Sequence, residues 1–76
     1  MLDITSFSMN EIIFLIEEDI EGGYNARALD QSIFTFGRDK EELLANVREA
    51  VKCHFDQVQA PKIIRLHYIK EEVYAA

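Results

Sequence analysis

Residues 12–24 read Ile12-Ile13-Phe14-Leu15-Ile16-Glu17-Glu18-Asp19-Ile20-Glu21-Gly22-Gly23-Tyr24. The apolar run at the start is typical of a buried strand. The paired glycines Gly22 and Gly23 can take the positive φ angles that a tight reversal needs. This stretch therefore predicts a β-hairpin, with residues 24–29 as its return strand and both glycines in a structural turn.

A third strand and a helix are expected after the hairpin. Residues 33–37 form a short apolar run, which predicts a strand that ends in a turn containing Gly37. Asp39 is a favourable N-cap residue, and Glu42 follows it at the spacing of a capping box. Both residues are therefore expected to cap a helix that begins after Asp39.

The predicted helix is amphipathic. Its apolar residues recur every three or four positions, which places them on one stripe facing the sheet. These are Leu44, Val47, Val51, Phe55 and Val58. Pro61 cannot continue a helix, so we expect the helix to end near Gln59. Residues 62–69 then alternate well enough to predict a fourth strand.

The expected fold class is α+β, with the order β-β-β-α-β, a small antiparallel sheet and one long helix packed on one of its faces. The 76 residues leave room for a single domain. We expect that domain to span residues 9–76 and residues 1–8 to be a disordered extension. Translation starts either at Met1 or at Met9.

The composition limits the kinds of partner that the chain can bind. Fourteen acidic against eight basic residues give a net charge of −6, which repels phosphate backbones and favours a basic partner over direct nucleic-acid binding. The single Cys53 cannot form an internal disulfide, and no Cys/His cluster has metal-ligand spacing, so no cofactor is expected. The chain shows neither a membrane-length apolar run nor a secretory signal, which predicts a cytoplasmic protein without a membrane partner.

A set of short motifs occurs in a fixed order along the chain. These are an acidic strand end with a Gly-Gly-aromatic turn at residues 17–24, a Thr-x-Gly step at 35–37, and a helix with paired acids and an Ala-Asn-x-x-Glu-Ala stretch at 41–50. In this order and spacing the chain resembles the HicB-like antitoxin family over about half its length. The resemblance implies a partial ribonuclease-H-like sheet.

The resemblance also implies a function. HicB-like antitoxins bind a small basic toxin, an RNA-cleaving HicA protein, and block its catalytic histidine. We expect this chain to mask such a toxin without a DNA-binding segment of its own, because too few residues follow Tyr68 for one. The alternative is a solitary homo-oligomeric protein of the same fold, with no toxin partner and an unknown role.

The expected interface lies on the first strand and the hairpin end. One helix covers only one face of a sheet, yet Ile13 and Leu15 supply apolar groups to the second face. Either a second copy, forming a homodimer or a higher oligomer, or a different partner would cover them. The exposed acids at the hairpin end would meet a basic partner. These acids are Glu17, Glu18 and Glu21.

No catalytic residue is expected, so the chain is predicted not to be an enzyme. Neighbouring carboxylates on a strand point to opposite faces, which is a poor arrangement for a metal site. Cys53 and His54 point about 100° apart on a helix, so they do not form a dyad. Core or interface positions, rather than base stacking, are expected for the aromatic residues Tyr24, Phe34, Phe36 and Tyr68.

Overall fold

The rest of the sheet is built on β1 (Glu11–Glu18). The computed structural model describes residues 10–76, and in β1 every second side chain is buried as far as Ile16. The buried side chains are Ile12, Phe14 and Ile16. Because side chains alternate across a strand, Ile13 and Leu15 lie on the opposite face of the sheet.

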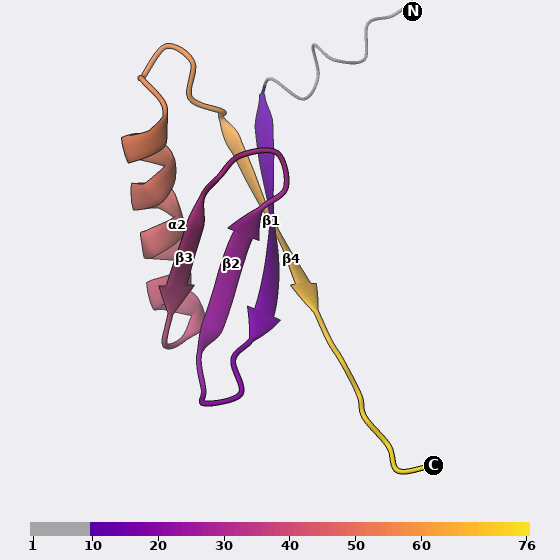
Figure 1. Ribbon diagram of the computed structural model, residues 1–76. Helices are drawn as coiled ribbons and strands as arrows, with labels where there is room; N and C mark the ends of the chain where they lie inside the picture. The colour runs from indigo at the N-terminus through magenta and orange to yellow at the C-terminus, as the bar shows by residue number, and fades with distance from the viewer. Residues whose placement is uncertain (1–9) are drawn as a thin grey trace, which may run out of the picture.

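The four strands form one mixed sheet in the order β3-β2-β1-β4 (Figure 1). β2 (Tyr24–Ala28) and β3 (Phe34–Gly37) extend the hairpin as an antiparallel meander. β4 (Ile63–Ile69) pairs with the other edge of β1 and runs parallel to it. The α+β class and the order β-β-β-α-β are confirmed, whereas the expectation of a wholly antiparallel sheet was wrong.

Chain direction explains the parallel pairing. β1, β2 and β3 alternate in direction, and α2 (Lys40–His54) then returns the chain to the end of the sheet at which β1 begins (Figure 1). Its 15 residues span about 22 Å, which is long enough to recross the sheet. β4 starts at that end and therefore runs in the same direction as β1.

α2 begins at a cap and ends before the expected residue. Asp39 is the N-cap, and its carboxylate accepts a hydrogen bond of 2.8 Å from the Glu42 N–H. The helix ends at His54 because Phe55 takes an extended conformation, with φ −114° and ψ 150°, and packs against the edge of the core. The expected end near Gln59 was wrong.

The buried stripe of α2 also differs in phase from the predicted one. It consists of Leu43, Val47 and Val51. Leu44 is only half-buried, and Val58 lies beyond the helix with 92% of its surface exposed. Gly37 accounts for this phase, because a Cβ there would overlap the Leu43 backbone. The helix therefore touches β3 at Leu43, which turns that side chain rather than Leu44 toward the sheet.

The core lies between α2 and the helix-facing side of the sheet. Ala26 and Ala28 are buried on β2, and these small side chains let the helix lie close above β2 and β3. The same side of β4 carries Ile64 and Leu66, which pack against the core but are only half-buried. The helix thus covers β2 and β3 more fully than β4.

Two expectations concern the N-terminal extension and membrane spans. The disordered extension expected over residues 1–8 lies outside the described residues. Within residues 10–76, no helix combines the length and the apolar character needed to cross a membrane. β1, β2 and α2 supply most of one hydrophobic cluster, and two residues of β4 pack against it.

Gly37→Ala should destabilise the protein more than Gly22→Ala. The new Cβ at position 37 would overlap the backbone of Leu43, which puts its cost at the upper end of the roughly 1–3 kcal/mol typical of overpacking. Gly22 has a φ of 104° but no neighbouring atom within 4 Å of a Cβ, so its alanine adds only backbone strain of about 1–2 kcal/mol. Urea unfolding followed by circular dichroism measures both variants. Equal stability of the two would contradict the close contact at Gly37.

Candidate functional site

Asp19 holds the tip of the β1–β2 hairpin in one shape. Its N–H donates to the Gly23 carbonyl, and its own carbonyl accepts from the Gly22 N–H, both at 2.9 Å. Its carboxylate accepts from the Glu21 N–H and from the Asn25 side-chain amide, again at 2.9 Å. Gly22 and Gly23 complete the turn with φ values of 104° and 87°. The sequence prediction treated Asp19 only as part of an acidic run and missed this Asx turn.

The hairpin tip is also tied to β3. A Cβ on Gly23 would lie 2.6 Å from Cζ of Phe36, so the aromatic ring occupies the space that any other residue would need. Gly23 therefore serves both the turn conformation and the packing of Phe36.

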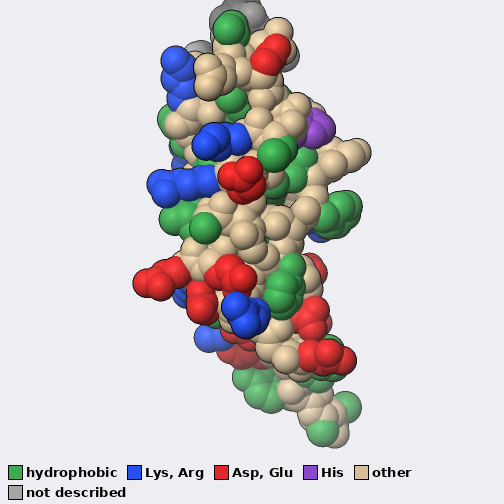
Figure 2. Space-filling model, turned by 90° about the vertical axis from the view of Figure 1, so that its left-hand side faces the viewer, with side chains coloured by type: hydrophobic (Ala, Val, Ile, Leu, Met, Phe, Trp, Pro, Cys, Tyr) green, Lys and Arg blue, Asp and Glu red, His purple; other side chains and the backbone are tan. Residues whose placement is uncertain are grey.

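Acidic side chains concentrate at one end of the molecule. The β1–β2 turn, the start of α2 and the end of β4 all lie at this end (Figure 1), and Figure 2 shows Asp and Glu side chains gathered over the lower half of the visible surface. We call it the acidic end. It comprises Glu17, Glu18, Asp19, Glu21, Asp39, Glu41, Glu42, Glu71 and Glu72.

Three carboxylates of the acidic end are available to a partner. Glu17, Glu18 and Glu21 are exposed, and none forms an ion pair with another residue in the range 10–76. The nearby Lys40 lies instead over the ring of Tyr68, with its Nζ 4.7 Å from the centroid. The acidic end therefore presents three exposed carboxylates without an ion-pair partner in the described part of the chain, and Lys40 and Lys70 line the same pocket as Glu18. Its acidic residues outnumber its basic ones, which leaves a negative surface.

Hydrogen bonds lower the pKa of two other carboxylates at this end. The Glu21 N–H and then the Asn25 amide hold the pKa of Asp19 below its ordinary value. The Arg38 backbone N–H at 2.9 Å and the Arg38 side chain at 3.1 Å lower the pKa of Glu42. Glu42 therefore reaches back to Arg38, rather than to the Asp39 N–H of a standard capping box.

The face of the sheet that points away from α2 is rich in apolar side chains. We call this surface the outer face. Its apolar side chains are Ile13, Leu15, Phe34, Phe36, Ile63 and Ile69. Phe34 is the most open, with 73% of its surface exposed, whereas Ile13 and Leu15 are half-buried. The two β1 residues expected at an interface thus share the outer face with four further apolar side chains, although the residues paired with them in the strand register are polar.

The outer face also carries charges of both signs. Leu15 lies opposite Arg27 of β2 and His67 of β4 in the strand register. Arg65 donates from Nε to a carboxylate oxygen of Glu11 at 2.6 Å. Glu17 is the second acid and forms no ion pair within residues 10–76, and the two arginines and two carboxylates of the outer face give it no net formal charge. Sequence reasoning did not assemble this set, because it depends on the register of three strands.

The four aromatic residues divide between the two faces. Tyr24 and Tyr68 lie on the helix-facing side and form an edge-to-face pair with ring centroids 5.8 Å apart. Phe34 and Phe36 lie on the outer face and are exposed. The two phenylalanines are therefore surface groups and do not belong to the core beneath α2.

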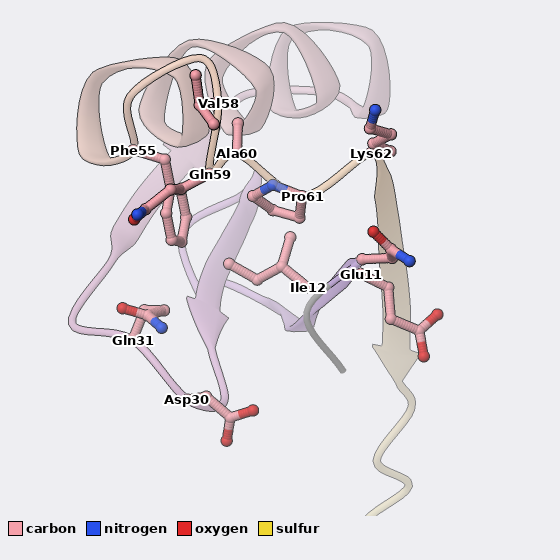
Figure 3. Close-up of a pocket in the computed structure, with 11 residues that line it drawn as sticks. Glu11, Ile12, Asp30, Gln31, Phe55, Val58, Gln59, Ala60, Pro61 and Lys62 are labelled. Atoms are coloured by element: carbon pink, nitrogen blue, oxygen red, sulfur yellow. The ribbon is translucent and has the colours of Figure 1, made fainter. Parts of the chain in front are cut away.

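A cavity of about 430 Å³ lies at the opposite end from the acidic end. It is lined by the start of β1, the β2–β3 loop and the α2–β4 loop. Figure 3 shows Ile12, Phe55 and Pro61 around its centre and Asp30 and Gln31 at its rim. Its described lining includes neither a thiol nor an imidazole, so these residues offer apolar contacts and hydrogen bonds but no Cys–His or Ser–His pair.

Cys53 and His54, which were considered for a dyad, contact different residues. The Sγ of Cys53 lies 3.7 Å from a carboxylate oxygen of Glu49, and Nε2 of His54 lies 3.1 Å from the side-chain oxygen of Gln31. His67 is on the outer face. Over residues 10–76 no cluster of three or more His, Cys, Asp or Glu side chains is arranged to hold a metal ion.

Two known proteins are clearly similar to this chain. A UPF0150 protein of Thermotoga maritima is 41% identical over 68 residues, which cover 90% of this chain and 96% of the relative. A UPF0150 protein of Archaeoglobus fulgidus is 50% identical over 52 residues, or 68% of this chain and 77% of the relative. No protein-family model matches the chain, and no solved structure matches it.

The free energy of unfolding should fall at acid pH, because Asp19 and Glu42 lose hydrogen bonds when they are protonated. Their ordinary pKa values are 3.8 and 4.5, and both pKa values are lower in the folded protein. The stabilisation is therefore present above these values and is lost as the pH falls through the lower folded values. Asp19→Asn combined with Glu42→Gln should flatten the dependence of unfolding free energy on pH below about 4.5.

The matched control for this experiment is Glu41→Gln, since Glu41 accepts no hydrogen bond from the part of the chain that the structure describes. It should keep the wild-type pH dependence. If the unfolding free energy of the Asp19→Asn, Glu42→Gln protein falls at acid pH as steeply as that of the wild type, these two carboxylates do not cause the acid dependence.

Proposed function

Because this chain belongs to the UPF0150 family, we propose that it is a binding protein of the HicB-like antitoxin type, whose acidic end masks a small basic RNA-cleaving toxin. Its ordered motifs support this proposal: the Gly-Gly-aromatic turn, the Thr-x-Gly step and the capped helix lie in consecutive elements of one small fold. Neither relative's name states a partner, so the toxin is inferred from the resemblance and from the charge.

The observation that carries the proposal is the set of unpaired carboxylates at the hairpin end. Glu17, Glu18 and Glu21 have no basic partner within residues 10–76. A basic protein would be attracted to this end before contact, because a surface of one sign raises the rate of association with an oppositely charged partner.

The hairpin tip is also ordered before any partner arrives. Four hydrogen bonds through Asp19 fix its backbone, and Gly23 packs beneath the ring of Phe36. A surface that is already ordered loses less conformational entropy on binding. The turn thus supports recognition indirectly, by holding the carboxylates that flank it.

The first test is affinity purification of the tagged chain from its native cells, followed by identification of small basic proteins that are retained in near-stoichiometric amounts. The retained protein should cleave RNA, and addition of this chain should inhibit the cleavage. Retention of no basic protein under low-salt conditions would favour the alternative of a solitary protein without a toxin.

Charge reversal at the acidic end should weaken that complex without unfolding the chain. Glu18→Lys with Glu21→Lys changes two exposed side chains, so unfolding free energy should change by no more than about 0.5 kcal/mol for each. The dissociation constant should rise, and the rise should shrink as salt is added. Isothermal titration calorimetry at two ionic strengths measures both effects.

Asp56→Lys provides the control, because Asp56 is exposed in the loop after α2, far from the hairpin end. It changes the net charge of the chain from −6 to −4, the same step as either single reversal, without altering the acidic end. It should therefore affect binding much less than Glu18→Lys alone. Equal effects of the two sets of variants would show that overall charge, rather than this surface, determines affinity.

A further inference from the structure

We propose that the outer face of the sheet is a dimer interface, on which the outer face of a second copy of this chain packs. The proposal concerns a different surface from most of the acidic end and does not depend on the existence of a toxin. It rests on the distribution of apolar groups, on local charge and on the layering of the fold.

The apolar groups of the outer face are spread over three of the four strands and are interleaved with polar side chains. β1 contributes Ile13 and Leu15, β4 contributes two apolar residues beside β1, and β3 contributes two more on the far side of β2, whose own outer-face residues are Asn25 and Arg27. Those residues are Phe34, Phe36, Ile63 and Ile69, all exposed. Apolar residues that recur on one face of a sheet, unlike scattered surface residues, mark an interaction surface.

Local charge identifies a second copy as the occupant. The chain carries a net charge of −6, so two copies repel each other through most pairs of surfaces. On the outer face Arg27 and Arg65 equal Glu11 and Glu17 in number, so the face has no net formal charge, although among these described residues only Arg65 and Glu11 form an ion pair. Two outer faces can therefore meet without a large repulsion between like charges.

The same charge balance disfavours the other occupants. A strongly basic protein gains more at the acidic end, where the carboxylates are unpaired. The phosphate backbone of a nucleic acid requires a positive surface, and the two bases of the outer face are matched by two acids.

The layers of the fold also favour a second copy on the outer face. The described fold has one helix on one side of a four-stranded sheet, and stable domains cover both faces of a sheet that carries apolar groups on both. Packing two sheets about 10 Å apart would complete a helix-sheet-sheet-helix sandwich around a second core. The dimer would keep Glu18 and Glu21 at the ends of its strands, so each dimer would present two acidic ends.

The test compares Phe34→Ser with Val58→Ser in sedimentation velocity of the full chain over the micromolar range. Both substitutions remove an exposed large apolar group, 73% and 92% exposed respectively, but only Phe34 lies on the outer face. The wild type and Val58→Ser should sediment as dimers, and Phe34→Ser should raise the dimer dissociation constant about tenfold or more.

Leu15→Glu is the second variant and should give monomers, because it places a charge at the centre of the interface. Circular dichroism must show native secondary structure in each variant, and Phe34→Ser remains decisive if Leu15→Glu unfolds, because Phe34 is largely exposed. A wild-type monomer throughout the concentration range would overturn the proposal. So would a dimer that Phe34→Ser weakens no more than Val58→Ser does, since such a dimer forms through another surface, such as an open strand edge.

Discussion

The pairing of β1 on both of its edges is the constraint on which the rest of the structure depends. β2 bonds to one edge in the antiparallel sense and β4 bonds to the other in the parallel sense. Both edges of β1 are thereby satisfied, and its alternating side chains are committed to two opposite faces. Phe14 and Ile16 become fully buried on the helix-facing side, while Ile13 and Leu15 become the centre of the outer face.

The parallel pairing also separates the surfaces of the protein. Because β1 and β4 end together, the acids that follow β4 join those of the β1–β2 turn at one end of the molecule. The loops at the other end enclose the cavity around Ile12 and Phe55. Negative charge therefore gathers at one end of the strands, whereas exposed apolar groups lie on the outer face of the sheet. This division allows one small chain to offer two chemically different surfaces.

Close contacts at two glycines and the positive φ of a third keep this arrangement compact. Gly37 lets α2 approach β3 at Leu43, and Gly23 makes room for the ring of Phe36. Gly22 serves the turn by its positive φ alone. In a chain of 76 residues the buried core is small, and small domains depend strongly on such contacts or on association. The apolar outer face is consistent with association as the remaining source of stability.

The sequence by itself determined the elements whose signals are local. The β-β-β-α-β order follows from apolar runs separated by turn and cap residues, and the division of β1 between two faces follows from its period of two. The tertiary structure alone decided the direction and partner of β4, because strand pairing depends on where α2 returns the chain. It also decided that Leu43 rather than Leu44 faces the sheet, since the contact at Gly37 sets the rotation of the helix. The outer face, finally, required the register of all four strands to bring Arg27, Arg65 and Phe34 onto one surface, and no local pattern along the chain contains that register.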